Sequence, residues 1–130
     1  MEQLRLYQKS DREALSLILL SEGVQPPDMK FEEYATWILE DDGLIGFFTL
    51  RREKGLPNVV HFAVSKERRS MSNARKLVKA LVIKARHYGK TMILHSKKDY
   101  LDKIIRYYFK TKPYTEADGY RFYIVKLGRA

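Results

Sequence analysis

The stretch FAVSKERRSMSNA, residues 62–74, decides how the rest of this 130-residue chain is interpreted. It begins inside an apolar run over residues 58–64, which predicts a strand. It leads into apolar residues at helical spacing over residues 73–88, which predict a long helix that ends before Gly89. A loop of small and basic residues at such a junction can aim backbone N–H groups, assisted by the helix dipole, at a phosphate.

Before this stretch, the pattern predicts a strand and two helices. Residues 4–8 form the expected strand, and a capping box of Ser10 and Glu13 begins a helix over about residues 11–22. A second helix is expected over residues 28–40, where apolar side chains recur at helical spacing before Asp-Asp-Gly. The apolar stripe of this second helix comprises Phe31, Tyr34, Ala35, Ile38 and Leu39.

The remaining elements complete an alternating pattern. Residues 44–52 and 58–64 predict a hairpin across a turn that contains Gly and Pro. Residues 91–95 predict a strand, residues 99–110 a helix and residues 120–127 a closing strand. The order β-α-α-β-β-α-β-α-β predicts a mixed α/β fold, with helices on both faces of a mixed sheet.

Composition narrows the class of protein. The chain is long enough for one core, so a single domain over residues 1–130 is expected. No apolar run approaches the roughly 20 residues of a membrane helix and no signal segment is evident, which predicts a cytoplasmic protein with no membrane association. There are no cysteines, and the histidines at 61, 87 and 95 lack metal-ligand spacing, so no metal is expected.

Charge is distributed unevenly along the chain. Residues 1–64 hold 7 Lys/Arg against 11 Asp/Glu, whereas residues 65–112 hold 15 against 3, a net of +12. The basic segment could neutralise a phosphorylated cofactor or a nucleic-acid backbone.

The junction resembles the phosphate-binding loop of the GNAT N-acetyltransferase superfamily. That family has Gln/Arg-x-x-Gly-x-Gly/Ala five residues past a strand-terminal Val, and here Arg69-x-x-Ser72-x-Ala74 follows Val64. The resemblance implies that acetyl-CoA binds along the strand end and the loop, through Phe62, Ala63, Val64, Arg69, Ser70, Met71, Ser72, Asn73, Ala74 and Arg75. It also offers Lys66, Arg68, Arg75 and Lys103 for the outlying phosphate. Ser72 replaces the central Gly, and an ordinary solvated turn with a Ser N-cap is the alternative.

A second match lies downstream. The family often has Asn, then Tyr seven residues later, then Gly-Phe; here Asp102, Phe109 and Pro113-Tyr114 occupy these places. Asp102 is thereby included among the cofactor-binding residues. Phe109 cannot protonate a thiolate, and Tyr108 beside it could substitute.

The resemblance implies acetyl transfer to an amine by direct attack within a ternary complex. His61 is the candidate base because its pKa suits that role, although strand alternation also allows a structural histidine. Tyr108 is the candidate acid, although its spacing from Ile104 and Ile105 also suits a core residue. A cationic acceptor, either a small-molecule amine or a protein lysine, is expected at an acidic cluster that comprises Glu22, Asp28, Glu32, Glu33 and Tyr34.

Two other functions stay open. The departures at Ser72, Phe109 and Pro113 fit a catalytically degenerate GNAT-fold binding or virion-associated protein, and the chain looks similar to short GNAT-like bacteriophage proteins, which would place it in the host cytoplasm. The basic segment over residues 65–112 also fits a nucleic-acid-binding module, with tyrosines available for stacking. No recognition motif favours that module. The oligomeric state is not determined by the sequence.

Overall fold

The fold is built on one mixed sheet, seen in a computed structural model that describes residues 1–53, 55–96 and 99–128. Within these residues, seven strands lie in the order β1-β2-β3-β4-β5-β7-β6. Their bounds are β1 Gln3–Leu6, β2 Ala35–Glu40, β3 Leu44–Arg51, β4 Asn58–Val64, β5 Thr91–Ser96, β6 Thr115–Ala117 and β7 Tyr120–Lys126. All neighbours are antiparallel except β4 and β5, which run parallel.

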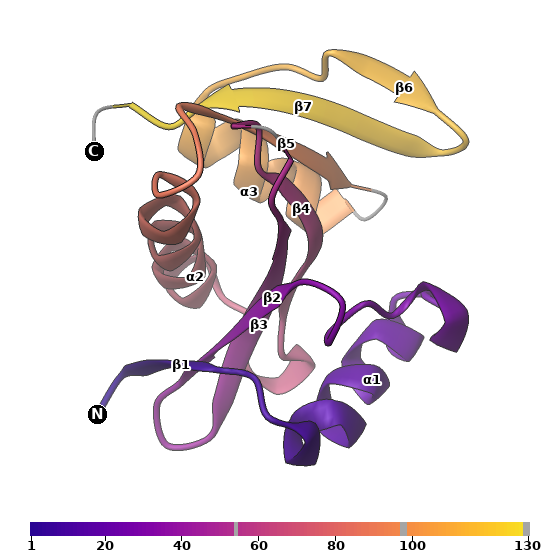
Figure 1. Cartoon of the computed structure of the whole chain (residues 1–130), viewed down its shortest axis with the longest axis vertical. Helices are drawn as coiled ribbons and strands as arrows, with labels where there is room; N and C mark the ends of the chain where they lie inside the picture. Colours follow the sequence, from indigo (N-terminus) through magenta and orange to yellow (C-terminus); the bar gives the residue numbers. More distant parts are fainter. Residues whose placement is uncertain (54, 97–98, 129–130) are drawn as a thin grey trace.

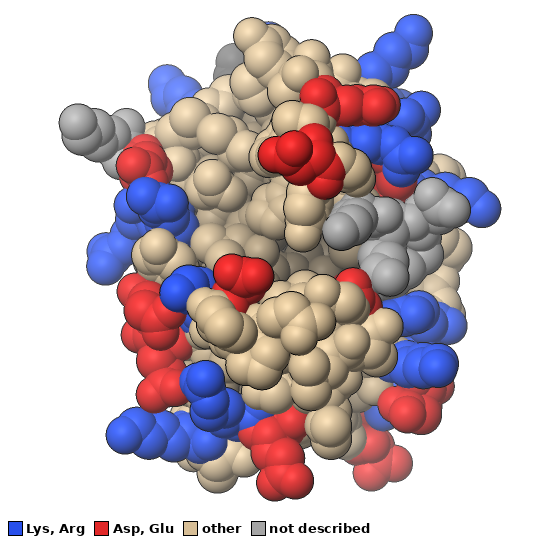
Figure 2. Space-filling view, turned by 90° about the vertical axis from the view of Figure 1, so that its right-hand side faces the viewer, with Lys and Arg blue, Asp and Glu red and all other residues tan. Residues whose placement is uncertain are grey.

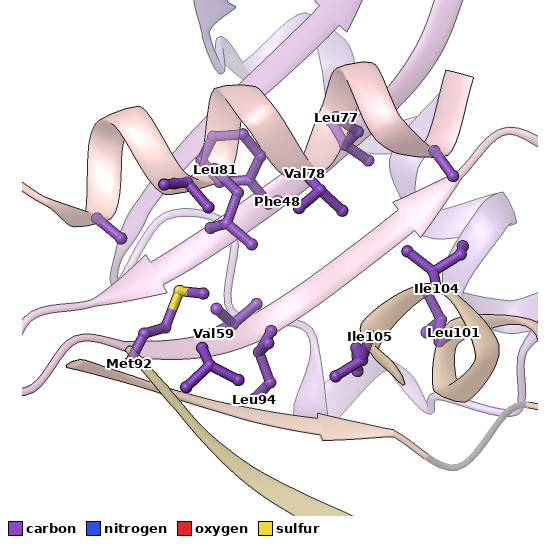
Figure 3. Packing of buried hydrophobic residues seen from close by; sticks show 14 of the residues in the cluster. Phe48, Val59, Leu77, Val78, Leu81, Met92, Leu94, Leu101, Ile104 and Ile105 are labelled. Carbon is purple, nitrogen blue, oxygen red and sulfur yellow. The ribbon is translucent and has the colours of Figure 1, made fainter. Parts of the chain in front are cut away.

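The helices cover both faces of this sheet (Figure 1). The described residues form three α-helices, which are α1 Arg12–Ser21, α2 Met71–Ala85 and α3 Asp99–Phe109. They also form short 3-10 turns, which are η1 Lys9–Asp11, η2 Pro26–Asp28 and η3 Lys66–Arg68. Leu77, Val78 and Leu81 of α2 point to the strands (Figure 3). Together with apolar side chains of α3, they form the larger of two cores, called the larger core below. On the other face, Leu15 and Leu19 of α1 pack on a smaller core. The predicted mixed α/β class, with helices on both faces of the sheet, is confirmed.

The predicted second helix over residues 28–40 is wrong, because residues 35–40 form strand β2. β2 lies between β1 and β3 and is buried on both faces. Ile38 packs in the core under α1, whereas Trp37 and Leu39 pack in the core under α2. A strand that is buried on both faces is apolar at consecutive positions, so its spacing can mimic a helical stripe.

The predicted capping box at Ser10 and Glu13 is also displaced. The cap joins Gln8 and Asp11 instead: the Gln8 backbone N–H donates to Asp11 Oδ2 over 2.8 Å, and the Asp11 backbone N–H donates to the Gln8 carbonyl over 2.8 Å. This cap begins η1, which continues directly into α1.

In the described chain, the ladder between strands β4 and β5 has only one residue pair, Asn58 opposite Ile93. The pairing of β3 with β4 shifts register so that Thr49 opposes His61 and Leu50 opposes Val59, which leaves Val60 as a bulge. A bulge bends its strand and increases the local twist. Beyond Asn58, β4 therefore diverges from β5, and the sheet opens between them.

Candidate functional site

A main cavity of about 460 Å³ lies where β4 and β5 diverge, on the face of the sheet that carries α1. Figure 2 shows this side of the molecule, hollowed near its centre between two lobes. Three walls enclose the cavity: β4, the ends of β5 and β7, and the segment from the end of α1 to η2. Its lining comprises Leu19, Glu22, Gly23, Val24, Asp28, Arg51, Asn58, Val59, Val60, His61, Phe62, His95, Ser96, Leu101, Tyr120 and Phe122.

The edge of β4 that faces β5 leaves backbone groups available along the cavity. One edge of β4 is paired with β3 as far as Val64, but on the other edge the ladder in the described residues stops at Asn58. Ala63 and Val64 are fully buried and Phe62 is half-buried against the larger core, so the backbone here is held firmly. A rigid, unpaired strand edge can hydrogen-bond an extended ligand that carries amides.

The start of α2 has a well-formed cap and two available amides. Ser70 is the N-cap, and its Oγ accepts from the Asn73 amide over 3.1 Å. The first amide within the helix ladder is that of Ala74, which donates to Ser70 O over 2.9 Å. The amides of Met71 and Ser72 donate to no acceptor in the described part of the chain, as expected for the first turn of a helix. Ser72 has negative φ, so it fits the place of the family's Gly without strain.

The two arginines before α2 are held by neighbouring elements. Arg68 donates to the carbonyls of Asp41 and Asp42 over 2.8 and 3.2 Å, which ties the loop to the turn between β2 and β3. Arg69 Nη2 lies 3.0 Å from Glu22 Oε2, and the Glu22 side chain is only 9% exposed. The loop is therefore fastened to the end of α1 at the rim of the main cavity.

A second hollow, the α2–α3 hollow, gathers cationic side chains outside the main cavity. Its lining is Arg75, Arg106, Tyr107, Tyr108 and Lys110. Arg75 donates to the Tyr107 hydroxyl over 3.2 Å and lies over its ring. Lys66 and Lys103, two further predicted phosphate ligands, lie outside both linings.

Asp102 is a buried carboxylate within an ion-pair network. Its Oδ2 lies 3.0 Å from Arg106 Nε and 3.6 Å from Arg121 Nη1, which joins α3 to β7. Its Oδ1 is buried and has no partner among the described residues. Asp102 is absent from the lining of the main cavity, so its predicted contact with the cofactor stays a prediction.

The ring of His61 lines the main cavity but is held by the fold. Its Nε2 accepts from the Lys30 amide over 3.0 Å, and the ring packs against Phe31 and Phe47. Burial, followed by the charge that His95 carries when protonated, lowers the pKa of His61 to about 4. His61 is therefore neutral near pH 7, and its one acceptor nitrogen is already engaged.

Tyr108 lies away from the main cavity. It borders the α2–α3 hollow, packs against the larger core and contacts the Phe109 ring at 5.1 Å. Its predicted role as the acid stays a prediction, and the packing matches the core alternative.

The predicted acceptor residues separate into two groups. Glu22 and Asp28 line the main cavity. Glu32 pairs with Arg12, Glu33 with Lys30, and Tyr34 lies under Arg51; none of these three acidic or aromatic residues is part of the cavity lining.

The sequence pattern did not indicate three aromatic residues that line the cavity: His95, Tyr120 and Phe122. The His95 ring lies 5.6 Å from the Tyr120 ring and 6.1 Å from the Phe122 ring. Burial lowers the pKa of His95. The position of His95 near the carboxyl end of a strand of an α/β sheet was the available signal.

The model of the acetyltransferase (GNAT) family matches residues 4–111. The chain belongs to this family. No curated protein matches this GNAT sequence at a significant level.

Solved structures show the same fold as this GNAT chain. A GNAT-family acetyltransferase from Staphylococcus aureus Mu50 has a TM-score of 0.75 at 15% identity, over 98% of this chain and 99% of that one. A GNAT-family acetyltransferase from Elizabethkingia anophelis with acetyl-CoA bound has a TM-score of 0.71 at 13% identity, over 96% and 97%. The ribosomal-protein-S18-alanine N-acetyltransferase of Escherichia coli has a TM-score of 0.68 at 13% identity, over 100% and 96%.

Two features are not found in the described part of this GNAT chain. No group of three or more His, Cys, Asp or Glu side chains is placed to hold a metal ion. Among the same residues, no helix has the length and apolar character to cross a membrane.

Proposed function

We propose that this GNAT chain transfers an acetyl group from acetyl-CoA to an amine bound in the main cavity. One observation carries the proposal: β4 leaves β5 after Asn58 and Ile93, and the strand edge so exposed leads to the available amides of Met71 and Ser72. An extended ligand with amides at one end and a diphosphate at the other fits this continuous track of donors and acceptors.

The residues present fit acetyl-CoA in chemistry. The backbone of Phe62, Ala63 and Val64 would hold the amide-bearing arm, and the first turn of α2 would hold the diphosphate. The cationic α2–α3 hollow, with Arg75 and Lys110, suits an additional phosphate. Acetyl-CoA supplies an activated acyl group, and a backbone N–H of the β4 edge can stabilise negative charge that develops on its carbonyl oxygen.

The acceptor would enter from the side of α1. Asp28 and Glu22 place carboxylates on that wall, and acidic side chains border the hollow on the face that Figure 2 shows. Glu22 pairs with Arg69, whereas Asp28 is exposed at the rim. A cationic amine, on a small molecule or a protein, is attracted to such a rim. We also propose that residues 1–130 form one domain around this site.

Thermal unfolding with increasing acetyl-CoA tests the cofactor site. A ligand at 100 times its Kd adds about 2.7 kcal/mol to the free energy of unfolding. Arg75→Glu places a negative charge in the α2–α3 hollow and should weaken binding by about tenfold or more. Lys79→Glu, the matched control, makes the same charge change at an exposed position of α2 outside both linings. An unshifted wild-type protein would remove the proposal.

Release of free thiol with amines then separates an active enzyme from an inert GNAT domain. Spermidine and a lysine-containing peptide represent small and protein acceptors. Acetyl-CoA binding without thiol release from either would favour the degenerate binding protein. The nucleic-acid alternative has less support, because Arg68 and Arg69 of the basic segment are held by Asp41, Asp42 and Glu22.

A further inference from the structure

His95 lies two residues beyond the point where β5 leaves β4. The partner of β4 is Ile93, so His95 is on the first part of β5 that is free of β4. Ile93 and His95 share the face opposite Met92 and Leu94, which pack in the larger core. The imidazole is therefore on the α1 side of the sheet, in the wall of the main cavity that faces β4.

The ring is held by packing while its nitrogens keep their hydrogen-bonding capacity. Tyr120 and Phe122 of β7 contact the ring, at 5.6 and 6.1 Å between centroids. Neither ring nitrogen of His95 has a hydrogen-bond partner within residues 1–53, 55–96 and 99–128. Neither nitrogen is among the buried atoms that lack a partner, so both remain accessible. A neutral imidazole has one acceptor nitrogen, and that of His95 is available to a molecule in the cavity.

His61 lines the same cavity, but its acceptor nitrogen is already hydrogen-bonded within the fold. Its Nε2 accepts from the Lys30 amide, so its lone pair serves the fold. Of the two histidines in the lining, His95 alone keeps an acceptor nitrogen available among the described residues. The charged or titratable groups that share the cavity with it are Glu22, Asp28, Arg51, His61 and Tyr120.

We propose that His95 is the general base of the acetyl transfer proposed above, on which this inference rests. The reacting nitrogen loses one proton to solvent before it attacks, so that it carries a lone pair. It then forms a bond to the acetyl carbon, and the bond from that carbon to sulfur breaks with its electron pair leaving on the thiolate. The second proton that the nitrogen loses moves to the unprotonated nitrogen of His95, directly or through one water, and then to solvent. The thiolate takes its proton from solvent.

The environment of His95 suits this role. Burial lowers its pKa, so the ring is neutral and able to accept a proton near pH 7. A weak base is sufficient, because a nitrogen that has begun to bond to the carbonyl carbon is far more acidic than a free ammonium. Asp28 and Glu22 line the same cavity, and Glu22 is paired with Arg69.

The test compares His95→Gln and His95→Ala with His87→Gln, a matched control at an exposed position after α2. With spermidine or a lysine-containing peptide, we expect kcat to fall about 100-fold or more in both His95 variants, within the range for loss of a general base. The thermal shift with acetyl-CoA should be kept, and added imidazole should restore part of the activity of His95→Ala. The rise of kcat with pH that follows the His95 titration should disappear, and His87→Gln should match wild type.

Three results would overturn the inference: kcat within threefold of wild type in His95→Gln, an unchanged pH profile, or a loss of activity matched by a loss of the acetyl-CoA shift with no rescue by imidazole. The last of these results would show that His95 is needed for the folded structure and not for proton transfer. A wild-type protein that acetylates neither amine contradicts the proposed function itself, whereas an active wild type with active His95 variants contradicts only the assignment of the base. Diethyl pyrocarbonate provides a readout without turnover, since it should modify His95 before His61.

Discussion

His61 and His95 face one cavity, but their ring nitrogens have different tasks. His61 accepts a backbone hydrogen bond and is 7% exposed, so its neutral form is part of the folded structure. From the strand pattern, His61 could be either a general base or a structural histidine. The contacts of its ring are those of a structural histidine. His95 could not be selected from sequence, because its importance depends on where β5 leaves β4 and on which rings of β7 surround it.

The pKa of His61 makes stability depend on pH. Its folded pKa of about 4 lies below the ordinary value of 6.5, so the unfolded chain binds more protons between these values. The free energy of unfolding therefore falls as pH drops from about 6.5 to 4, by on the order of 3 kcal/mol from this residue. His95, whose pKa is also lowered, acts in the same direction.

Denaturant titrations at several pH values measure this effect. His61→Gln, which can still accept from the Lys30 amide, should show a clearly smaller loss of stability in this range. His87→Gln should keep the wild-type slope. An equal slope in wild type and His61→Gln would show that burial does not hold His61 neutral.

At the scale of elements, α2 was predictable because its apolar residues recur over four turns. β2 was not, because a strand buried on both faces lacks the alternation that distinguishes it from a helix. The β6–β7 hairpin was also missed, although Asp118 and Gly119 carried its signal. Both have positive φ, as the two central residues of a tight hairpin turn require.

A matched pair on α2 tests which of its faces stabilises the fold. Leu81 is 1% exposed and Ile83, two residues away, is 57% exposed. Leu81→Ala should lower the free energy of unfolding by about 2–5 kcal/mol, because it leaves a cavity under the helix. Ile83→Ala should change it by less than about 0.5 kcal/mol, since the side chain is solvated. Similar losses in both variants would contradict the packing of α2 described above.

On the scale of the whole molecule, the charge asymmetry of the sequence gives opposite charge to the two parts of the proposed site. The loop and helix that would hold a diphosphate belong to the +12 segment, whereas the acceptor wall from α1 to η2 belongs to the acidic first half. The sequence predicted this division and the family, but the bulge at Val60, which opens the sheet, appears only once β3 and β4 are paired.

Salt should therefore weaken acetyl-CoA binding. Increasing KCl from 50 to 500 mM shortens the screening length from about 14 Å to about 4 Å, and the attraction between the basic segment and a polyanion falls accordingly. We expect Kd from calorimetry to rise about tenfold, and less steeply in Arg75→Glu. A Kd independent of salt would place the phosphates away from these cations.

The single ladder pair that joins β4 to β5 in the described residues has a mechanical consequence. The sheet has two blocks, β1-β2-β3-β4 and β5-β7-β6, which are joined by one ladder pair. Helix α2 and the apolar side chains beneath it pack against both blocks. The boundary between β4 and β5 can therefore act as a hinge. Apolar side-chain packing sets its stiffness, because backbone hydrogen bonds between the two strands contribute little. Warming or pressure should widen it before either block melts, which amide exchange along β5 would register as early loss of protection.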